Sequence, residues 1–499
     1  MLILLDGLDE VPTRNINEVI GQIQNFVDRY DKNRFIASCR IAAYRSGFRR
    51  FSDVAMADFD DTQIEQFINN WFQSEVDKQA ETANKCWEIL QKLEHKAAKE
   101  LAHTPLLLTF LCLVYDRSQS FPNNRSILYG KALGILLEEW ASEKRILRDE
   151  IYQGLRTEQE EILLSEIAYK GFEADRLFFS QREVVEQIKT FLASNLNAPQ
   201  HLEGKAVLNA IAIQQGILVE RAEDVFSFSH LTLQEYLTAQ YIDDHQQIKE
   251  LVTEHLTDKR WKEVFLLVAG LMRGGADELL LLMEKEAQKY INTPKLKALL
   301  QWAEQATAGS ESNIKPMGKR AVAIAHAYGN NNSYSYADAI TNVNTISNIS
   351  STANDSGIHN AIVYIYSNVY TYYANANANA NAIAIVNAIT RLFIYELEKL
   401  KIFNNVDFDV LIIQLKAQIS DNQQLLESPP EFAERLLQTW LKAFKLNLEM
   451  LNLSKEEADT LENYLYANYL IIQCKEAAVR VSPKTWEEIE ERMLLVPNN

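Results

Sequence analysis

The chain has 499 residues, of which 47% are hydrophobic and 24% are charged, as is typical of a globular protein with about two to four domains. Its formal net charge of −18 repels phosphate backbones at long range, which argues against nucleic acid as the main partner. The four cysteines show neither close pairing nor metal-ligand spacing with histidine, and the longest strongly apolar run, 106–115, is too short to span a membrane. We therefore expect a soluble, cytoplasmic protein without a membrane partner.

The N-terminal 60 residues predict an α/β segment. Residues 2–5 have the pattern of a short buried strand that ends at Asp6, and residues 34–39 have the pattern of a second one. Between them, residues 17–30 repeat apolar side chains at helical spacing. Residues 53–60 alternate weakly and are a candidate third strand. Strands that alternate with a helix indicate a parallel sheet.

From residue 61 the pattern becomes helical. Thr62 has the chemistry of a helix cap, and a further helix is predicted through the 80s and 90s. Thr104 and Pro105 suit the cap and the first position of another helix. Residues 125–145 and 157–172 also have helical periodicity.

The pattern changes again at residues 217–228, where two short apolar stretches flank a charged turn and predict a β-hairpin. Thr232 to Glu235 then has the form of a capping box, and the helix that follows places Leu233 and Tyr236 on one face. A helix, a hairpin and a second helix in this order predict a winged-helix domain.

The second half of the chain is helical in pattern, except for one tract. Residues 246–305 predict helical hairpins, and residues 391–499 return to strong helical periodicity, for example at 432–451. Residues 328–390 are rich in Asn, Ala, Ile, Tyr and Ser, and residues 374–385 are of low complexity. Degenerate helical repeats and a disordered, aggregation-prone tract both fit this composition.

The predicted fold class is therefore mostly α, with a partial α/β segment at the N-terminus, a helical domain, a winged helix and C-terminal helical repeats or a bundle. The predicted boundaries are 1–60 for the α/β segment, 61–145 for the helical domain, 146–245 for the winged-helix domain, 246–327 for the helical hairpins, 328–390 for the Asn/Ala-rich tract and 391–499 for the C-terminal helical domain.

An acidic motif follows the first predicted strand. Four apolar residues lead into Asp6, and Asp9 and Glu10 follow in the next turn. A carboxylate at the carboxyl edge of a parallel sheet can hold Mg²⁺, which prefers oxygen ligands and bridges nucleotide phosphates. We expect Asp6 to hold the ion through water, and Asp9 or Glu10 to orient or activate a water for attack on a γ-phosphate. An acidic turn without a metal is the alternative.

The segment LLDGLDEV, at 4–11, resembles the extended Walker B motif of NACHT domains, which belong to the signal-transduction ATPases with numerous domains (the STAND class). The segment RFIASCR, at 34–40, resembles the strand of that family that ends in the sensor 1 arginine, and Arg40 stands at that position. The resemblance implies that Arg40 contacts the γ-phosphate, where a guanidinium can neutralise developing charge. Without the resemblance, Arg40 is a surface arginine.

Two further segments match the same family in the same order. HTPLLLTFLCLVY, at 103–115, is similar to the first helical domain, in which a proline opens a helix and packs on adenine, and Pro105 matches that proline. FSFSHLTLQEYLTAQYI, at 226–242, is similar to the winged-helix domain, in which a histidine contacts the β-phosphate of ADP, and His230 matches that histidine. Local sequence alone makes Pro105 a helix-start proline and His230 a structural histidine. SPKTWEEIEERM, at 482–493, resembles the C-termini of bacterial, especially cyanobacterial, NACHT proteins.

The sequence departs from the family at the phosphate-binding loop, which reads G-x-x-x-x-G-K-[ST]. The Gly-Lys pairs that begin at Gly130, Gly204 and Gly318 lack both the earlier glycine and the following Ser or Thr. The loop is expected before the Walker B strand, where this chain starts. We therefore expect a chain truncated before Walker B, which alone binds nucleotide weakly or not at all and hydrolyses it negligibly. The complete parent protein would use ATP or ADP and Mg²⁺.

The resemblance implies part of an ATP/ADP-controlled switch in signal transduction, with defence as one candidate process. ADP would hold the helical and winged-helix domains against the NTPase core. A ligand sensed by the C-terminal region would release them, and ATP would favour a self-oligomer or binding of protein partners. The main alternative is a nucleotide-independent helical interaction scaffold, which residues 246–499 fit unaided. A metal-dependent hydrolase is a third reading, with one acidic cluster and no histidine close to it in sequence.

Overall fold

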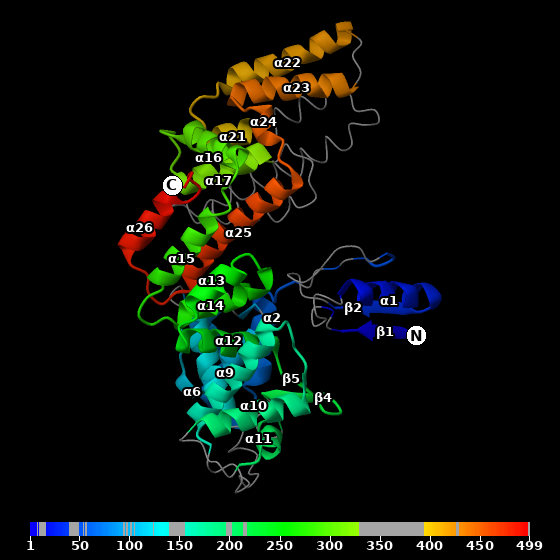
Figure 1. The fold of residues 1–499 in the computed structure, drawn as a ribbon, viewed down its shortest axis with the longest axis vertical. Helices are drawn as coiled ribbons and strands as arrows, with labels where there is room; N and C mark the ends of the chain where they lie inside the picture. Colours follow the sequence, from blue (N-terminus) through cyan, green and yellow to red (C-terminus); the bar gives the residue numbers. More distant parts are fainter. Residues whose placement is uncertain are drawn as a thin grey trace. The chain divides into compact units, whose positions relative to one another are not determined.

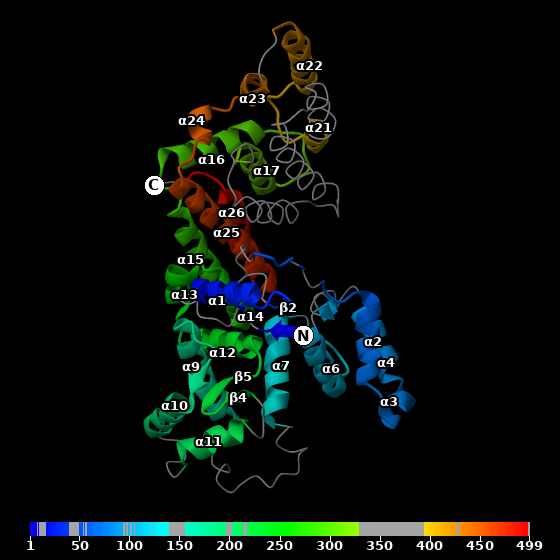
Figure 2. The same cartoon turned by 90° about the vertical axis from the view of Figure 1, so that its right-hand side faces the viewer.

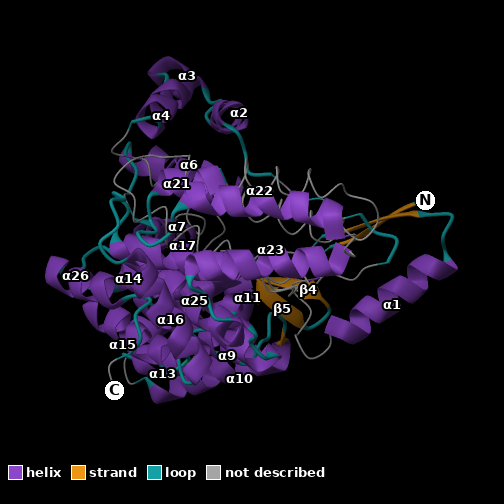
Figure 3. Ribbon diagram, turned by 90° about the horizontal axis from the view of Figure 1, so that it is seen from above, coloured by secondary structure: helices purple, strands orange, loops and turns teal. Residues whose placement is uncertain are grey.

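The computed structural model describes residues 1–6, 8, 16–38, 49–52, 54, 57–92, 95, 98–99, 102–103, 105–122, 124–138, 155–195, 202–212, 217–328, 394–425 and 429–497. The low-complexity tract at 374–385 lies outside these residues. The described part of the chain is mostly helical, with strands at two places (Figure 3), so the predicted fold class is confirmed.

The chain divides into two compact units. The first unit contains residues 1–251, 258–276 and 477–480, and the second contains residues 252–257, 277–476 and 481–499.

The N-terminal segment is a parallel β-α-β arrangement. Strand β1 (Leu2–Leu5) pairs in parallel with β2 (Arg34–Ala37), and helix α1 (Ile16–Arg29) lies between them in sequence. Figure 1 shows α1 beside the strands, where Phe26 of the helix meets Phe35 of β2 edge to face at 5.8 Å. These three elements agree with the predicted ones. No described residue of 53–60 is in a strand, so the candidate third strand is not found there.

Helices follow in the next part of the first unit. They are α2 (Asp61–Trp71), α3 (Glu75–Ala80), α4 (Thr82–Leu90), α6 (Pro105–Ser118) and α7 (Arg125–Glu138). The predicted cap at Thr62 is wrong, because Asp60 caps α2 instead. The Asp60 carboxylate accepts a hydrogen bond from the Gln63 amide at 2.8 Å, and the Gln63 side chain accepts one from the Asp60 amide at 3.0 Å. The predicted cap at Thr104 lies outside the described residues.

Three helices and a three-stranded antiparallel sheet, followed by one further helix, form the winged helix. In chain order they are α9 (Thr157–Glu173), β3 (Phe179–Ser180), α10 (Gln181–Ser194), α11 (Gly204–Ala210), β4 (Leu218–Ala222), β5 (Val225–Phe228) and α12 (Leu231–Asp244). The strand order is β3-β5-β4. The hairpin is where the sequence predicts it, whereas β3 has only two residues and is too short to show a period. Figure 2 shows α9, α10, α11 and α12 around the hairpin.

Close packing between α9 and the sheet explains one glycine of the winged helix. A Cβ atom added at Gly171, in α9, would lie 2.4 Å from Cζ of Phe179, which is fully buried in β3. A side chain of any size at position 171 would therefore displace the ring that joins the small sheet to the helices.

The chain continues through three short elements, α13 (Ile248–His255), the 3₁₀ turn η6 (Lys259–Trp261) and α14 (Lys262–Leu271). Helix α13 is divided between the units, because its residues from 252 onward belong to the second unit, whereas η6 and α14 belong to the first. Helix α14 packs on α12 and α7. Trp261 is fully buried and meets Phe172 of α9 edge to face at 4.8 Å. Arg260 donates to the carbonyl of Phe172 at 3.0 Å and to the carboxylate of Asp175 at 2.7 Å, so it closes the C-terminal end of α9.

The second unit has helices and no strands among its described residues. Its elements are α15 (Asp277–Gln288), α16 (Pro294–Thr307), α17 (Pro316–Tyr328), α21 (Tyr395–Leu400), α22 (Phe408–Leu425), α23 (Pro429–Phe444), α24 (Leu448–Leu451), α25 (Lys455–Ala477, whose last residue belongs to the first unit) and α26 (Pro483–Arg492). The single helix predicted at 432–451 is two helices, α23 and α24. They separate at Lys445, which has a left-handed φ of 53°.

Three sets of hydrogen bonds connect α26 to α15, to α17 and to the residue before α17. Arg492 donates to both carboxylate oxygens of Glu284 at 2.8 Å, and Lys315 donates to both oxygens of Glu490 at 2.7 and 3.0 Å. Arg320 is buried, and its Nε donates to the carbonyl of Met493 at 3.0 Å, just beyond the end of α26. Nη2 of Arg320 donates to the carbonyls of Glu490 at 3.4 Å and Glu491 at 2.9 Å, so a cation satisfies carbonyls of the last turn and complements the helix dipole.

Candidate functional site

The parallel register of β1 and β2 determines which side chains share the carboxyl edge of the sheet. Leu5 is opposite Ala37, so Asp6 and Ser38 are the next residues along the two strands. The Ser38 amide donates to the carbonyl of Leu5 at 2.9 Å, which extends the ladder by one step. The Ser38 hydroxyl in turn donates to Oδ1 of Asp6. The structure thus brings Asp6 together with a residue that the sequence motifs did not indicate.

The turn after β1 is attached to the same place. The amide of Leu8, a buried residue, donates to the carbonyl of Ser38 at 3.0 Å. Hydrogen bonds from both the amide and the carbonyl of Ser38 therefore fix the carboxyl ends of the two strands relative to each other. Asp6 is exposed at this edge, so its carboxylate is accessible to a solvated ion.

The donor set at this edge fits a hard cation. Asp6 offers carboxylate oxygens and Ser38 a hydroxyl oxygen, which are ligand types of Mg²⁺, and there is no soft sulfur donor among the described residues of the edge. Asp9, Glu10 and Arg40, the other predicted residues of this region, lie outside the described residues. Their roles therefore remain predictions.

Pro105 is the first residue of α6, as the sequence predicts. It is exposed, and its carbonyl accepts a hydrogen bond from the Thr109 hydroxyl at 3.1 Å. Further along the helix, Leu108, Leu111 and Cys112 are almost completely buried, so the middle of α6 belongs to the core. Burial raises the pKa of the Cys112 thiol to about 12, so this cysteine is a small core residue.

His230 joins the second wing strand to helix α12. It occupies the N-cap position with extended backbone angles, φ −138° and ψ 139°, and its side chain makes no capping hydrogen bond. The side chain is exposed, next to the amides of the first turn of α12. A helix N-terminus with an exposed cationic or donor side chain beside it is chemically suited to a phosphate group.

The capping box predicted at Thr232–Glu235 is wrong, because α12 already begins at Leu231 and Glu235 is buried. Glu235 instead belongs to a charged cluster between helices. Arg125, at the start of α7, donates to both carboxylate oxygens of Glu263 in α14 at 2.8 Å, and Glu235 interacts electrostatically with Arg125. Burial, together with the Glu263 carboxylate, raises the pKa of the neighbouring Tyr129. The cluster connects α7, α12 and α14.

The neighbours of Glu235 are packing residues. Gln234 is buried, and its side-chain amide donates to the carbonyls of Ala168 at 3.4 Å and Arg176 at 3.3 Å, at the end of α9. Tyr236 is also buried, and its hydroxyl oxygen lies close enough to Gly130 of α7 that an added Cβ there would be 2.7 Å away.

The described site residues therefore lie on separate elements: Asp6 at the end of β1, Pro105 in the first turn of α6 and His230 before α12.

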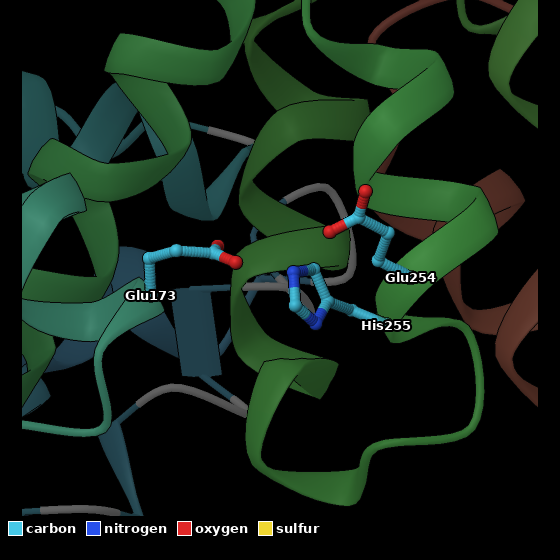
Figure 4. Close-up of side chains that lie close together, drawn as sticks. All are labelled: Glu173, Glu254 and His255. Carbon is cyan, nitrogen blue, oxygen red and sulfur yellow. The ribbon is translucent and has the colours of Figure 1, made fainter.

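Figure 4 shows three other side chains of metal-ligand type, Glu173 at the end of α9 and the neighbours Glu254 and His255 at the end of α13. Glu173 belongs to the first unit and the other two to the second, so we assign them no common role. Within the described residues, no helix is both long and apolar enough to cross a bilayer.

The geometry defines a class of multidomain protein in which a winged helix is preceded by a helical domain and followed by a C-terminal helical one. Residues 125–242 match the family model of the winged helix-turn-helix domain C-terminal to NACHT, and residues 408–496 match NACHT C-terminal helical domain 2. Comparison with curated proteins gave no match. Through these two domains, the chain is related to the NACHT-type NTPases of the STAND class.

Proposed function

We propose that this chain is part of a NACHT-type ATP/ADP-controlled signalling switch and does not hydrolyse ATP by itself. The observation that carries the proposal is the match of residues 125–242 to the NACHT-associated winged helix, within which His230 lies between the second wing strand and α12. The match at 408–496 supports the same relation independently, because it comes from a separate domain.

The exposed face of the β1–β2 pair supports the idea that the strands belong to a larger sheet. Leu2, Leu4 and Ile36 are 55%, 66% and 56% exposed, whereas parallel strands are normally covered on both faces. A further layer of protein over this face would bury these side chains. The two strands described here therefore suit an NTPase core that other segments complete.

The residues at the carboxyl edge would act on the phosphates. Asp6 would hold Mg²⁺, whose charge neutralises the phosphate oxygens, and Arg40 would contact the γ-phosphate. Asp9 or Glu10 would orient a water molecule. Pro105 would pack on the adenine, and His230 would contact the β-phosphate of ADP. The chain lacks the sequence G-x-x-x-x-G-K-[ST], whose amides and lysine supply most phosphate contacts, so these residues alone would hold nucleotide weakly.

The first test is nucleotide binding and hydrolysis by the purified 499-residue chain. We expect a Kd for ADP or ATP weaker than about 1 mM, where the standard free energy of binding is only about −4 kcal/mol. Hydrolysis should not exceed that of a Glu10→Gln variant. Micromolar ADP binding by the wild-type chain would contradict the proposed inactivity.

The second test examines the native protein. We expect the complete parent protein, isolated from its source cell, to carry bound ADP, which a His230→Ala variant should lose more readily. Parent protein isolated without nucleotide would contradict the switch.

A nucleotide-independent helical scaffold is the second candidate function. The observation in its favour is the solvent-facing side of α22, where Val410 and Ile413 are 45% and 66% exposed one turn apart. Partner binding that is equal with and without ADP, and unchanged by His230→Ala, would favour the scaffold over the switch.

A further inference from the structure

We propose that Ser38 is a positioning residue for the metal-binding carboxylate of Asp6. This inference rests on the proposed function, because it concerns the residue that would hold Mg²⁺ there. Its basis is one hydrogen bond, from the Ser38 hydroxyl to Oδ1 of Asp6, between two strands whose register is fixed.

The backbone holds Ser38 in place on both of its sides. Its amide donates to the carbonyl of Leu5 at 2.9 Å, and its carbonyl accepts from the amide of Leu8 at 3.0 Å. Leu5 directly precedes Asp6, and Leu8 follows two residues after it. The hydroxyl is therefore attached to the same short stretch of chain that carries the carboxylate, and its position changes little when the carboxylate rotates.

The hydrogen bond distinguishes the two oxygens of the carboxylate. Oδ1 accepts the hydrogen bond of the Ser38 hydroxyl, so the other oxygen, Oδ2, is the one that would bind an ion or its bound water. Because Asp6 is exposed, its side chain would otherwise sample several rotamers, and each bound ion would require it to be ordered. A partner that orients a metal-binding carboxylate in advance reduces this entropic penalty.

The neutral hydroxyl also leaves the negative charge of Asp6 uncompensated. A serine hydroxyl can donate to the ionised carboxylate without adding a positive charge, so the attraction between Asp6 and a cation is preserved. A lysine or arginine at position 38 would instead compete with the metal ion for the carboxylate. The pairing of a strand-end aspartate with a neutral donor is therefore suited to binding a cation, and not only to closing a turn.

The test uses the full chain with selectively labelled methyl groups and Mn²⁺ as the probe for the metal. Paramagnetic broadening of the Leu5, Leu8 and Ala37 methyl signals reports an ion at this edge, and exposed acidic groups elsewhere broaden other signals. Ser38→Ala should raise the Mn²⁺ concentration needed for half-broadening about threefold to tenfold. Loss of a residue that orients a metal ligand typically weakens metal binding by about tenfold or more, and the effect here should be smaller because the hydrogen bond is exposed. Ser38→Thr keeps the hydroxyl and should behave like the wild type. Asp6→Asn should abolish the localised broadening.

The outcomes separate this inference from the proposed metal site. Equal broadening in Ser38→Ala and wild type, with loss in Asp6→Asn, would overturn the role of Ser38 and leave the metal site intact. Weakened binding in both Ser38→Ala and Ser38→Thr would also overturn it, because the hydroxyl would not be the cause. If the wild type shows no localised broadening, the metal site itself is refuted. The same holds if the localised broadening survives in Asp6→Asn. The methyl spectra without Mn²⁺ show whether each variant keeps the β1–β2 pairing.

Discussion

His326 is a titratable residue enclosed by aromatic rings in the core of the second unit. It lies on α17 and is 1% exposed, with ring centroids of Phe444, Trp440 and Phe403 at 4.3, 5.3 and 5.5 Å. Burial lowers its pKa from 6.5 to about 3, because an imidazolium would lose its hydration there. The folded unit therefore holds this histidine neutral at pH values where the unfolded chain would protonate it.

This difference predicts how the stability of the second unit depends on pH. The folded-state pKa is lower than the unfolded one, so the contribution of His326 is fully present above pH 6.5 and is lost as the pH falls toward 3. Between pH 7 and pH 5 the wild type should lose about 2 kcal/mol of unfolding free energy through this residue. His326→Phe, which keeps an aromatic ring, should lose about 2 kcal/mol less over the same interval in urea unfolding. Identical losses in both proteins would show that His326 is not the cause.

Arg125 provides a second prediction at the residue scale. It is bound by both oxygens of Glu263, and the two side chains are 32% and 24% exposed. Removing one partner of a buried pair leaves the other charge uncompensated, and partial exposure reduces that penalty. Arg125→Ala should lower the unfolding free energy of the first unit by about 2 kcal/mol.

A double-mutant cycle isolates the pair from other effects of the truncation. Glu263→Gln should be less destabilising in the Arg125→Ala background than in the wild type, because the unpaired carboxylate is then removed. Lys189→Ala, at an exposed position on α10, is the control and should change stability by less than about 0.5 kcal/mol. Strictly additive effects of the two changes would mean that the ion pair has no coupling energy.

At the scale of elements, helical periodicity predicted most of the fold. The apolar spacing in 17–30 and 157–172 and the hairpin signal at 217–228 correspond to α1, α9 and β4–β5. Helix ends were predicted less well, since a cap depends on which of several adjacent polar residues finds the amide. At α12, Glu235 is buried and interacts electrostatically with Arg125 of another helix, so it does not serve as a cap. Local sequence contains no information about such a partner.

The candidate site was predictable only in part for the same reason. Asp6 was identifiable because a carboxylate directly after an apolar strand has a local pattern. Ser38 was not, because its hydrogen bond to Asp6 depends on the register between two strands that are 32 residues apart in the chain. Parallel pairing of this kind is specified by the whole sheet and its covering helix, and no motif within either strand reports it.

Two helical glycines give opposite predictions for the same substitution. A Cβ at Gly171 would lie 2.4 Å from the Phe179 ring, whereas nothing lies within 4 Å of a Cβ at Gly134 in α7. Gly171→Ala should therefore destabilise the first unit by about 1–3 kcal/mol through overpacking, despite the better helix propensity of alanine. Gly134→Ala should stabilise it by up to about 1 kcal/mol. Thermal unfolding measures both, and stabilisation by Gly171→Ala would contradict the packing of β3 on α9.

At the scale of the whole molecule, charge opposes the nucleic-acid binding for which helix-turn-helix folds are often used. Helices α10 and α11 form that motif, and the second helix is the one that enters a DNA groove in DNA-binding members. Here Glu203 directly precedes α11, and Glu223 lies in the turn of the wing, both exposed. These carboxylates add to a net charge of −18, so phosphate repulsion acts at both long and short range.

The chain should therefore bind duplex DNA with a Kd larger than about 10⁻⁴ M at physiological salt. This affinity is weaker than that of ordinary non-specific DNA binding. Fluorescence anisotropy with a labelled random duplex measures this affinity, and repeating it at several salt concentrations gives the electrostatic slope. A Glu203→Lys/Glu223→Lys variant is the matched comparison, because it reverses charge at the positions that would approach the backbone. It should bind measurably more tightly, and its affinity should fall steeply with salt. Micromolar, salt-dependent binding by the wild type would mean that the winged helix recognises nucleic acid in spite of its charge.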